Sequence, residues 1–263
     1  MPFFNFLRPP QSRNPLAFVF YATDEIYAVA VMVFVHRLQD LGIRSDADVV
    51  LLHLPLSQKI LQRIKRLGIT ARQVETVQTV KSWGFRDCLV KLRVLELAEY
   101  DRILYLDADA IPMKNLDDLL SLPITGPLAA PRAYWLPQPF WTSALFVAQP
   151  SIACWNRVKP HFAAAVRKDY LDMEIINCEF AQDIQSLPAT VFCLNSEWEE
   201  GDRPGFFGDP VAAYANVSVA HFTSLGKPWT YSTADAKRLR PNAHPLFYEL
   251  WDKWRTTREL ILR

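Results

Sequence analysis

The sequence predicts an α/β protein whose mainly parallel sheet carries helices on both faces. Three observations support this fold class. Short apolar runs typical of buried strands alternate with longer segments of helical character. Residues that start and stop helices, such as serine and glycine, separate the two kinds of segment. Acidic side chains directly follow one apolar run, and parallel sheets bind ligands beyond the carboxyl ends of their strands.

The expected elements follow one another along the chain. Apolar runs place strands at residues 16–22, 48–54, 71–77 and 102–106. Helices are expected at residues 25–41, from the cap Ser57 to the stop Gly68, at residues 86–99 and at residues 244–263. Because parallel strands need a long crossover between them, this alternation favours a Rossmann-like, mainly parallel sheet.

Composition and charge exclude several classes of protein. The chain has 263 residues, of which 50% are hydrophobic and 22% charged, a balance typical of a globular protein with a substantial core. A formal net charge of +1 gives no overall attraction to nucleic acid or to an anionic membrane. We therefore expect neither as a partner.

Cysteine spacing and apolar run lengths bear on the compartment. Four cysteines without a CxxC pair favour small core thiols of a reducing compartment over a zinc site, with one or two disulfides as the alternative. The longest apolar run, residues 27–35, is too short to cross a membrane, and no signal peptide is recognisable. We expect a cytoplasmic protein, or a Golgi-lumenal one if the chain is a catalytic domain cut from a longer, anchored parent.

Asp107 and Asp109 stand immediately after the apolar run 102–106. Carboxylates at a strand end are costly to desolvate unless a cation or a hydrogen-bond donor compensates them. Two aspartates at this spacing supply two hard oxygen ligands for one Mg²⁺ or Mn²⁺ ion. The alternative is that one aspartate caps the next segment while the other is solvated.

Two classes of enzyme place Asp-x-Asp after a hydrophobic strand. Haloacid-dehalogenase phosphatases use the first aspartate as a nucleophile, and nucleotide-sugar glycosyltransferases use the pair to hold a metal on a diphosphate. The phosphatase pattern opens the domain and has Thr or Val two residues after the second aspartate. Here three expected strands precede the motif and Ile111 follows it, so the transferase interpretation is favoured.

Several stretches, in order from residue 16 to about residue 230, resemble glycosyltransferase family 8. This family includes glycogenin, the bacterial lipooligosaccharide galactosyltransferases and their fungal relatives. The matching stretches read FVFYATDEIY, VKLRVLELAEYDRILYLDADAIPMKNLDDLL, WTSALFVAQPS, LDMEIIN and HFTSLGKPW. Each match alone is modest, but their order and the nearly literal last stretch are specific.

The resemblance implies a GT-A fold and a retaining transfer from a UDP-sugar with Mn²⁺, or Mg²⁺ as the alternative ion. Asp107, Asp109 and His221 would ligate the metal, and Asp172 and Lys91 would have catalytic roles. The donor would contact the residues that match the family's motifs, which are Thr23, Asp24, Tyr27, Lys91, Ala108, Ser143, Asp172, Gly226 and Lys227. We expect a single domain with a nucleotide-binding half at about 16–120 and a donor-sugar and acceptor half at about 121–235.

The sequence also departs from the family pattern. Thr142 replaces an asparagine near the donor sugar, and Met173 replaces a glutamine that is the candidate nucleophile of double-displacement proposals. Glu174 is a conceivable substitute, and Asp183 offers a rival alignment for Asp172. Without a nucleophile, the acceptor hydroxyl would arrive on the face that UDP leaves.

Three functions therefore stay open: a transferase for glycans or glycoconjugates, a glycogenin-like self-glucosylating protein, and a catalytically inactive UDP-sugar-binding module. Self-glucosylation would use a tyrosine, and the candidates are Tyr134, Tyr170, Tyr214 and Tyr231. Four aromatic residues could form a platform for an acceptor sugar or lipid, although core or loop packing is the more common role of such residues. They are Trp135, Phe140, Trp141 and Trp198. We expect a monomer or a homodimer.

Overall fold

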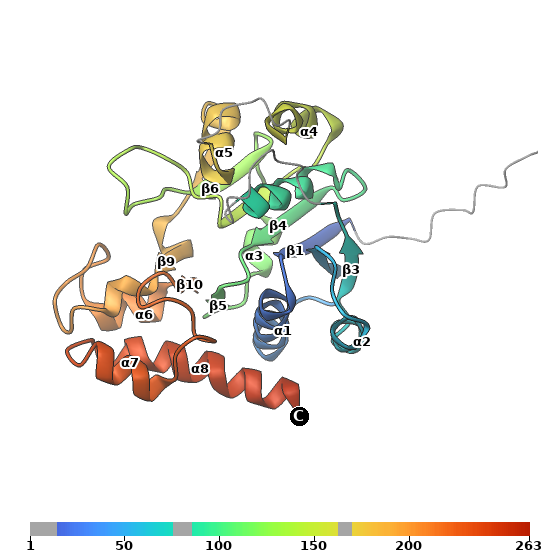
Figure 1. The fold of residues 1–263 in the computed structure, drawn as a ribbon. Coiled ribbons are helices and arrows are strands. Elements are labelled where there is room, and N and C mark those ends of the chain that lie inside the picture. The colour runs from blue at the N-terminus through green and yellow to red at the C-terminus, as the bar shows by residue number, and fades with distance from the viewer. Residues whose placement is uncertain (1–14, 76–85, 163–169) are drawn as a thin grey trace, which may run out of the picture.

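A computed structural model describes residues 15–75, 86–162 and 170–263 (Figure 1). Within these residues a seven-stranded sheet has the order β3-β2-β1-β4-β7-β6-β8. Its strands are β1 (Leu16–Ala22), β2 (Ala47–His53), β3 (Thr70–Gln73), β4 (Arg102–Leu106), β6 (Leu128–Pro131), β7 (Leu145–Ala148) and β8 (Ile184–Leu187). All neighbouring pairs are parallel except those that involve β7, which confirms the mainly parallel sheet.

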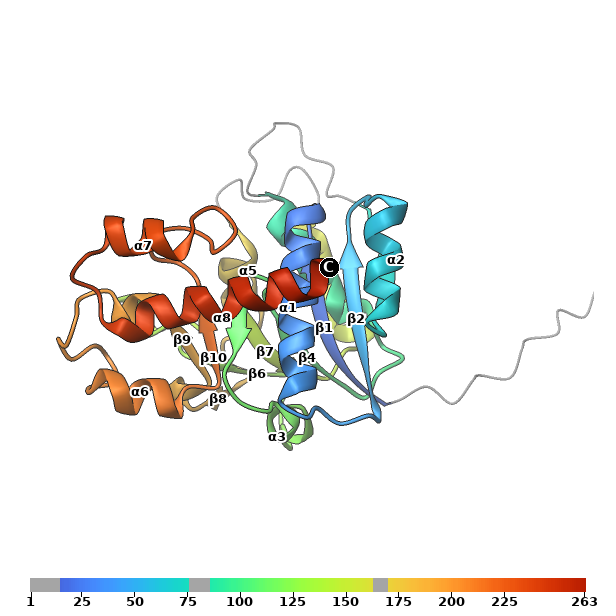
Figure 2. The same ribbon diagram turned by 90° about the horizontal axis from the view of Figure 1, so that it is seen from below.

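Helices cover both faces of this sheet. On one face lie α1 (Glu25–Asp40), α2 (Gln58–Arg66) and α8 (Pro245–Leu262), and α8 packs across α1 (Figure 2). On the other face lie η1 (Arg86–Glu96), α4 (Ile152–Val158) and α5 (Asp172–Phe180). Alternate residues of β1 divide between the two cores: Phe18 and Phe20 enter the first, whereas Val19 and Tyr21 enter the second.

A smaller sheet brings distant parts of the chain to the end of β4. It consists of β5 (Ala110–Pro112), β10 (Val219–His221) and β9 (Phe192–Leu194), in the order β5-β10-β9. His221 pairs with Ala110 in the antiparallel β5–β10 register. The remaining helices are α3 (Asp117–Ser121), α6 (Pro210–Asn216), α7 (Thr233–Leu239), η2 (Lys159–Phe162), η3 (Ala189–Val191) and η4 (Asn195–Trp198).

Local sequence explains where the first helices begin and end. The Asp24 carboxylate accepts hydrogen bonds from the N–H groups of Ile26 and Tyr27 and so caps α1. Ser57 caps α2 in the same way, through the N–H of Ile60. Gly42 and Gly68 follow the two helices with φ of 75° and 76°, a conformation that favours glycine.

Two expectations differ from the structure. The helix expected at 86–99 is a 3₁₀ helix and ends three residues earlier, at Glu96. The apolar pattern indicates a buried helical segment but does not distinguish i→i+3 from i→i+4 hydrogen bonding. Strand β3 ends at Gln73, and the last two residues of the expected strand 71–77 lie outside the described residues.

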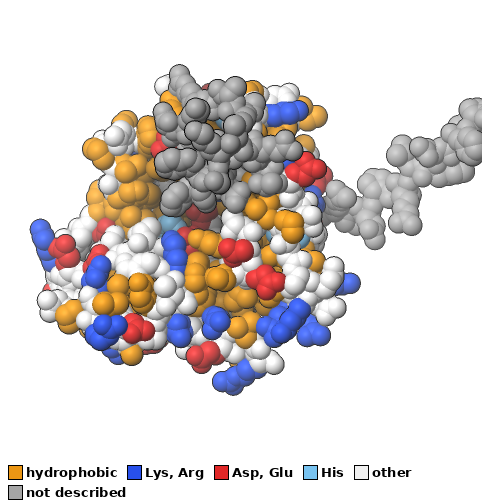
Figure 3. Space-filling model, viewed as in Figure 1, with side chains coloured by type: hydrophobic (Ala, Val, Ile, Leu, Met, Phe, Trp, Pro, Cys, Tyr) orange, Lys and Arg blue, Asp and Glu red, His pale blue; other side chains and the backbone are white. Residues whose placement is uncertain are grey.

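No helix within the described ranges is both long and apolar enough to cross a membrane. The cysteines Cys88, Cys154, Cys178 and Cys193 are all free, as the sequence predicted. Figure 3 shows basic and acidic side chains interspersed on the visible face, without a basic stripe of the kind that binds nucleic acid.

Candidate active site

The Asp-x-Asp segment leaves the sheet at the carboxyl end of β4 and enters β5. The Asp107 N–H donates to the Ala144 carbonyl at 2.8 Å, and the Asp109 carbonyl accepts from the Phe222 N–H at 3.0 Å. These backbone bonds fix the segment between β7 and the residue that follows β10. The paired strands thus bring His221 beside two aspartates that are more than a hundred positions away in sequence.

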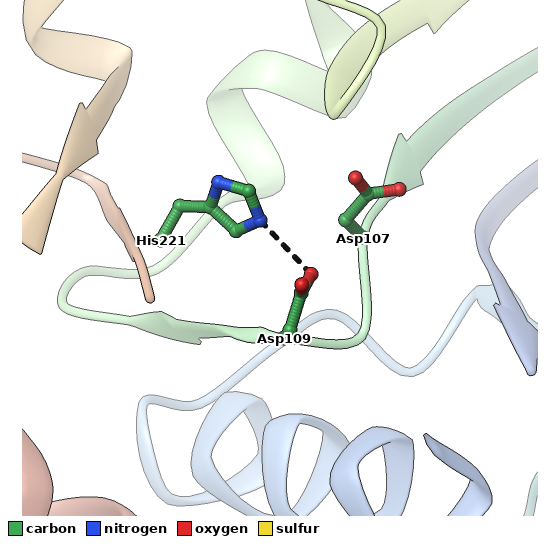
Figure 4. Close-up of side chains that lie close together, drawn as sticks. All are labelled: Asp107, Asp109 and His221. Carbon is green, nitrogen blue, oxygen red and sulfur yellow. Dashed lines mark hydrogen bonds and ion pairs between the residues drawn. The ribbon is translucent and has the colours of Figure 1, made fainter. Parts of the chain in front are cut away.

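Asp107, Asp109 and His221 form the group that the sequence singled out as metal ligands. One potential ligand atom from each lies within 4.8 Å of the others. Figure 4 shows the His221 imidazole directed at Asp109, with Nε2 2.9 Å from Oδ1. Two carboxylates and an imidazole are a donor set suited to Mn²⁺.

Burial and neighbouring cations set the charges of this group. Burial raises the pKa of Asp107 above its ordinary value, although Lys91 opposes the rise. Burial acts in the same direction on Asp109, but His221 and Lys227 outweigh it and hold the pKa of that carboxyl well below its usual range. Asp109 is therefore an anion at neutral pH.

Lys91 joins the metal-ligand group to the predicted donor-sugar residues. Its ammonium lies 3.0 Å from Asp107 Oδ1 and 2.6 Å from Asp172 Oδ2. The Ser143 hydroxyl donates to Asp172 Oδ2 at 2.6 Å. Burial alone would lower the pKa of Lys91, yet the two aspartates raise it, so the ammonium stays charged. Lys91 and Ser143 likewise hold the pKa of Asp172 below its usual value despite burial.

Lys227 approaches the group from the loop after β10. Its ammonium lies 2.5 Å from Asp109 Oδ2 and donates to the Phe222 carbonyl. Gly226, with φ of 87°, precedes it, and Leu225 has φ of 62°, which is uncommon for a residue with a side chain. The loop thus folds tightly back on the metal-ligand group.

An open pocket of about 480 Å³ lies next to these residues, a size typical of small-molecule sites. Its lining includes the predicted donor-binding residues Thr23, Asp24, Tyr27, Lys91 and Ala108, together with Asp107 and Asp109. Burial and the nearby aspartates raise the pKa of Tyr27 to about 12, so its hydroxyl remains a donor. The Asp24 carboxylate lies here too, although one of its oxygens already caps α1.

Three neighbours of the predicted residues were missed by the sequence analysis. Tyr105 donates its hydroxyl to Asp107 Oδ1 at 2.7 Å, and the strand alternation that puts residues 105 and 107 on one face could have indicated it. Cys88 lines the pocket and lies beside Asp172. Asn195 is fully buried, and its side-chain oxygen accepts from the N–H groups of Thr223 and Ser224. No sequence pattern pointed to Cys88 or Asn195.

Thr142, which departs from the family pattern, and the alternative acidic residues Glu174 and Asp183 all have structural roles. Buried Thr142 accepts from the Ala144 N–H at 3.1 Å, and Glu174 accepts from the Leu171 N–H at the start of α5. The rival aspartate, Asp183, pairs with Arg157 at 2.7 Å on the surface. Asp172, not Asp183, is therefore the aspartate that reaches Lys91.

Of the two roles considered for the aromatic residues, core packing is the one found for Trp141 and Trp198. Trp198 is fully buried and donates to the Pro210 carbonyl, and Trp141 is 6% exposed. Both belong to the core, which is the more common place for tryptophan inside a domain. Trp135 packs partly buried against Phe192, with ring centroids 6.1 Å apart.

Comparison with known proteins places this geometry in a family. The family model described as glycosyl transferase family 8 matches residues 18–182, well over half of the chain. The chain belongs to glycosyl transferase family 8. The match begins within β1 and includes the Asp-x-Asp segment and all of α5, whose first residue is Asp172.

Curated relatives of this family 8 chain include proteins named glucose N-acetyltransferase 1 and proteins named glycogenin-1. Glucose N-acetyltransferase 1 of Gibberella zeae is 25% identical over 81% of this chain and 53% of its own length. Glycogenin-1 of Oryctolagus cuniculus is 27% identical over 89% of this chain and 74% of its own length. The chain spans 53% and 64% of the lengths of two curated relatives named glucose N-acetyltransferase 1.

Solved structures confirm the expected GT-A fold. A bifunctional glycosyltransferase, WbbM, superposes with a TM-score of 0.70 at 15% identity, covering 96% of this chain and 50% of WbbM. The galactosyltransferase LgtC, solved with donor and acceptor sugar analogues, superposes with a TM-score of 0.62 at 15% identity. That likeness covers 92% of this chain and 99% of LgtC.

Proposed function

We propose that this chain transfers a sugar from a UDP-sugar to a hydroxyl group of a glycan or glycoconjugate, with Mn²⁺ and with retention of configuration. The observation that carries the proposal is the Asp107–Asp109–His221 group, whose ligand atoms lie within 4.8 Å of one another beside an open pocket. Family membership supplies the general activity, glycosyl transfer.

The donor set fits a divalent cation. Two carboxylates and one imidazole converge from β4–β5 and β10, and hard oxygen ligands with a neutral imidazole suit Mn²⁺, with Mg²⁺ as the alternative. When bound, the ion would neutralise negative charge on the diphosphate as UDP departs. Lys227, beside Asp109, would bind the same diphosphate as a second positive charge.

The remaining predicted residues would contact two parts of the donor, the uridine and the sugar. Thr23, Asp24 and Tyr27 at the start of α1 would contact the uridine, since they line the pocket near Asp109. Asp172, held by Lys91 and Ser143, would accept hydrogen bonds from hydroxyls of the donor sugar. In this scheme residues 16–120 supply the nucleotide site, and residues 121–235 supply the sugar and acceptor side.

A front-face reaction agrees with the side chains present. Met173 has no nucleophilic group, and Glu174 is engaged with the Leu171 N–H. The bond between the anomeric carbon and the phosphate oxygen would break while the acceptor oxygen bonds to the same face of that carbon. The acceptor's proton would pass to a phosphate oxygen of the departing UDP. A covalent sugar adduct on Asp172 or Glu174, trapped and located by mass spectrometry, would contradict this route.

Self-glucosylation is a second candidate, favoured by the similarity to glycogenin-1. Among the candidate tyrosines, Tyr134 donates its hydroxyl towards Cys193, and Tyr214 donates its hydroxyl to Glu249. Tyr231 is half-buried and close to Gly226. Intact mass before and after incubation with UDP-glucose and Mn²⁺ separates this function from transfer to another molecule, because only self-glucosylation adds hexose units to the chain.

The decisive experiment is release of UDP from UDP-glucose, UDP-galactose, UDP-N-acetylglucosamine, UDP-xylose and UDP-glucuronic acid. We expect release from at least one donor with Mn²⁺ and none with EDTA. Asp109→Asn should lower the rate by about 100-fold or more, because it removes an anionic metal ligand. Asp183→Asn is the matched control and should keep the wild-type rate. Mn²⁺-dependent thermal stabilisation by UDP without release from any donor would instead indicate an inactive binding module.

A further inference from the structure

Hydrogen bonds of both the side chain and the backbone hold Asp107 in position. Its Oδ1 atom accepts two hydrogen bonds, from the Tyr105 hydroxyl at 2.7 Å and from the Lys91 ammonium at 3.0 Å. Its backbone N–H donates to the carbonyl of Ala144, the residue just before β7. The Lys91 ammonium also lies 3.3 Å from Oδ2, so protein groups hold the carboxylate at both oxygens and most closely at Oδ1. Figure 4 shows this carboxylate in the same group as Asp109 and His221.

Tyr105 is well suited to be the anchor because it cannot move freely. It lies in β4, two residues before Asp107, and its side chain is 1% exposed. Its ring stacks on Phe146 of the neighbouring strand β7, with centroids 5.0 Å apart and planes 26° apart. The Lys91 ammonium lies 5.7 Å from the centre of the same ring. Packing therefore sets the position of the hydroxyl, and the hydroxyl in turn sets the rotation of the carboxylate.

We propose that Tyr105 is a positioning residue for metal binding, which rests on the proposed function of the Asp107–Asp109–His221 group. By donating to Oδ1, Tyr105 limits the rotation of the Asp107 carboxylate, which offers one oxygen within 4.8 Å of the potential ligand atoms of Asp109 and His221. A hydrogen-bonded partner behind a ligating carboxylate limits its rotation, and losing such a partner typically costs 10- to 100-fold in metal affinity. Tyr105 lines the open pocket, and in this proposal its hydroxyl donates to Asp107 and does not ligate the metal.

The chain offers a matched control for the test. Tyr100 is also buried, lies two residues before the start of β4, and donates its hydroxyl to a carboxylate, Asp48 Oδ2, at 2.8 Å. Tyr100→Phe and Tyr105→Phe therefore make the same chemical change to the same kind of bond. Only Tyr105→Phe removes a bond to a proposed metal ligand, and both variants keep the packed ring.

The experiment measures Mn²⁺ affinity in the presence of UDP, from the free-ion signal in electron paramagnetic resonance. We expect about a tenfold weaker affinity for Tyr105→Phe than for the wild type and no change for Tyr100→Phe. Steady-state rates should show the same split: the Mn²⁺ concentration for half-maximal UDP release rises, while the rate at saturating Mn²⁺ changes little. A general loss of folding would instead lower the saturating rate and the melting temperature.

The outcomes separate the two proposals. If wild-type protein binds Mn²⁺ and Tyr105→Phe binds it equally well, the positioning role is wrong and the metal site stands. If Tyr105→Phe and Tyr100→Phe weaken Mn²⁺ binding equally, the effect is not local and the positioning role is also wrong. If the wild type itself does not bind Mn²⁺, the metal site is wrong, and the role of Tyr105 falls with it.

Discussion

Lys227 Nζ lies 2.5 Å from Asp109 Oδ2, so a proposed diphosphate-binding lysine contacts a proposed metal ligand directly. The Asp109 side chain is 13% exposed, and His221 Nε2 contacts its other oxygen at 2.9 Å. The Lys227 ammonium is paired with Asp109 Oδ2, an oxygen that could otherwise ligate the metal ion, so the lysine and the ion compete for it. Metal binding and diphosphate binding are therefore coupled through the position of Lys227.

Lys227→Met should separate these two effects. Without the competing ammonium, Mn²⁺ binding in the absence of UDP should become tighter by about fivefold, which corresponds to the roughly 1 kcal/mol typical of a partly exposed ion pair. With Mn²⁺ present, UDP should bind more weakly, because one positive charge near the diphosphate is lost. Titration calorimetry with Mn²⁺ alone and then with UDP gives both values. Weaker binding of Mn²⁺ alone would show that Lys227 does not compete with the ion.

Lys91→Met should strongly destabilise the protein. Lys91 is 6% exposed and bridges Asp107 and Asp172, so its removal leaves buried carboxylates without their cation. Breaking a buried ion pair in this way costs about 3–5 kcal/mol in the free energy of unfolding. The double variant Lys91→Met/Asp172→Asn should recover part of that loss, since one uncompensated charge is gone. Urea unfolding at pH 7 measures both, with exposed Lys114→Met as the control; equal stability of Lys91→Met and wild type would refute the argument.

Asn195→Ala should weaken UDP binding from outside the pocket. The Asn195 side chain accepts from the Thr223 N–H at 2.8 Å and the Ser224 N–H at 2.9 Å, at the base of the loop that carries Lys227. Each buried N–H left without a partner costs about 1–3 kcal/mol, so both stability and loop position should suffer. Exposed Asn115→Ala, which loses bonds to the carbonyls of Leu41 and Gly42, should lower stability without changing UDP affinity. Unchanged UDP affinity in Asn195→Ala would show that the loop holds its position without this amide.

The sequence predicts the strands and the first two helices better than it predicts which residues meet in the site. Strand β4 and the start of α1 agree with the prediction, because apolar runs of this length are local signals. The cap that Asp24 provides was not part of that prediction. The contact of His221 with Asp109 depends on β5–β10 pairing across the chain, and no local pattern states which strands pair. His221 was predicted as the third member of the group from the family resemblance instead.

Residues such as Tyr105 and Asn195 could not be ranked from sequence because their roles depend on what surrounds them. A tyrosine in an apolar strand is ordinary, and only the fold shows that its hydroxyl meets Asp107. The 3₁₀ helix at Arg86–Glu96 is a similar case. Its residues are buried along most of its length, so tertiary packing rather than local propensity sets its geometry.

Cys88 provides a test of the electrostatics that needs no assay of activity. Burial, followed by the negative charge of Asp172, raises the pKa of the Cys88 thiol to about 12. Because only the thiolate reacts, about one molecule in ten thousand is reactive at pH 8, and the rate of alkylation should rise about tenfold per pH unit up to pH 11. Asp172→Asn removes the nearby negative charge, so it should lower the Cys88 pKa and speed labelling at pH 8. Mass spectrometry of iodoacetamide-treated protein gives the rates, with exposed Cys178 as the internal reference. A Cys88 rate that levels off below pH 10, or that falls in Asp172→Asn, would contradict the charge arrangement around Lys91 and Asp172.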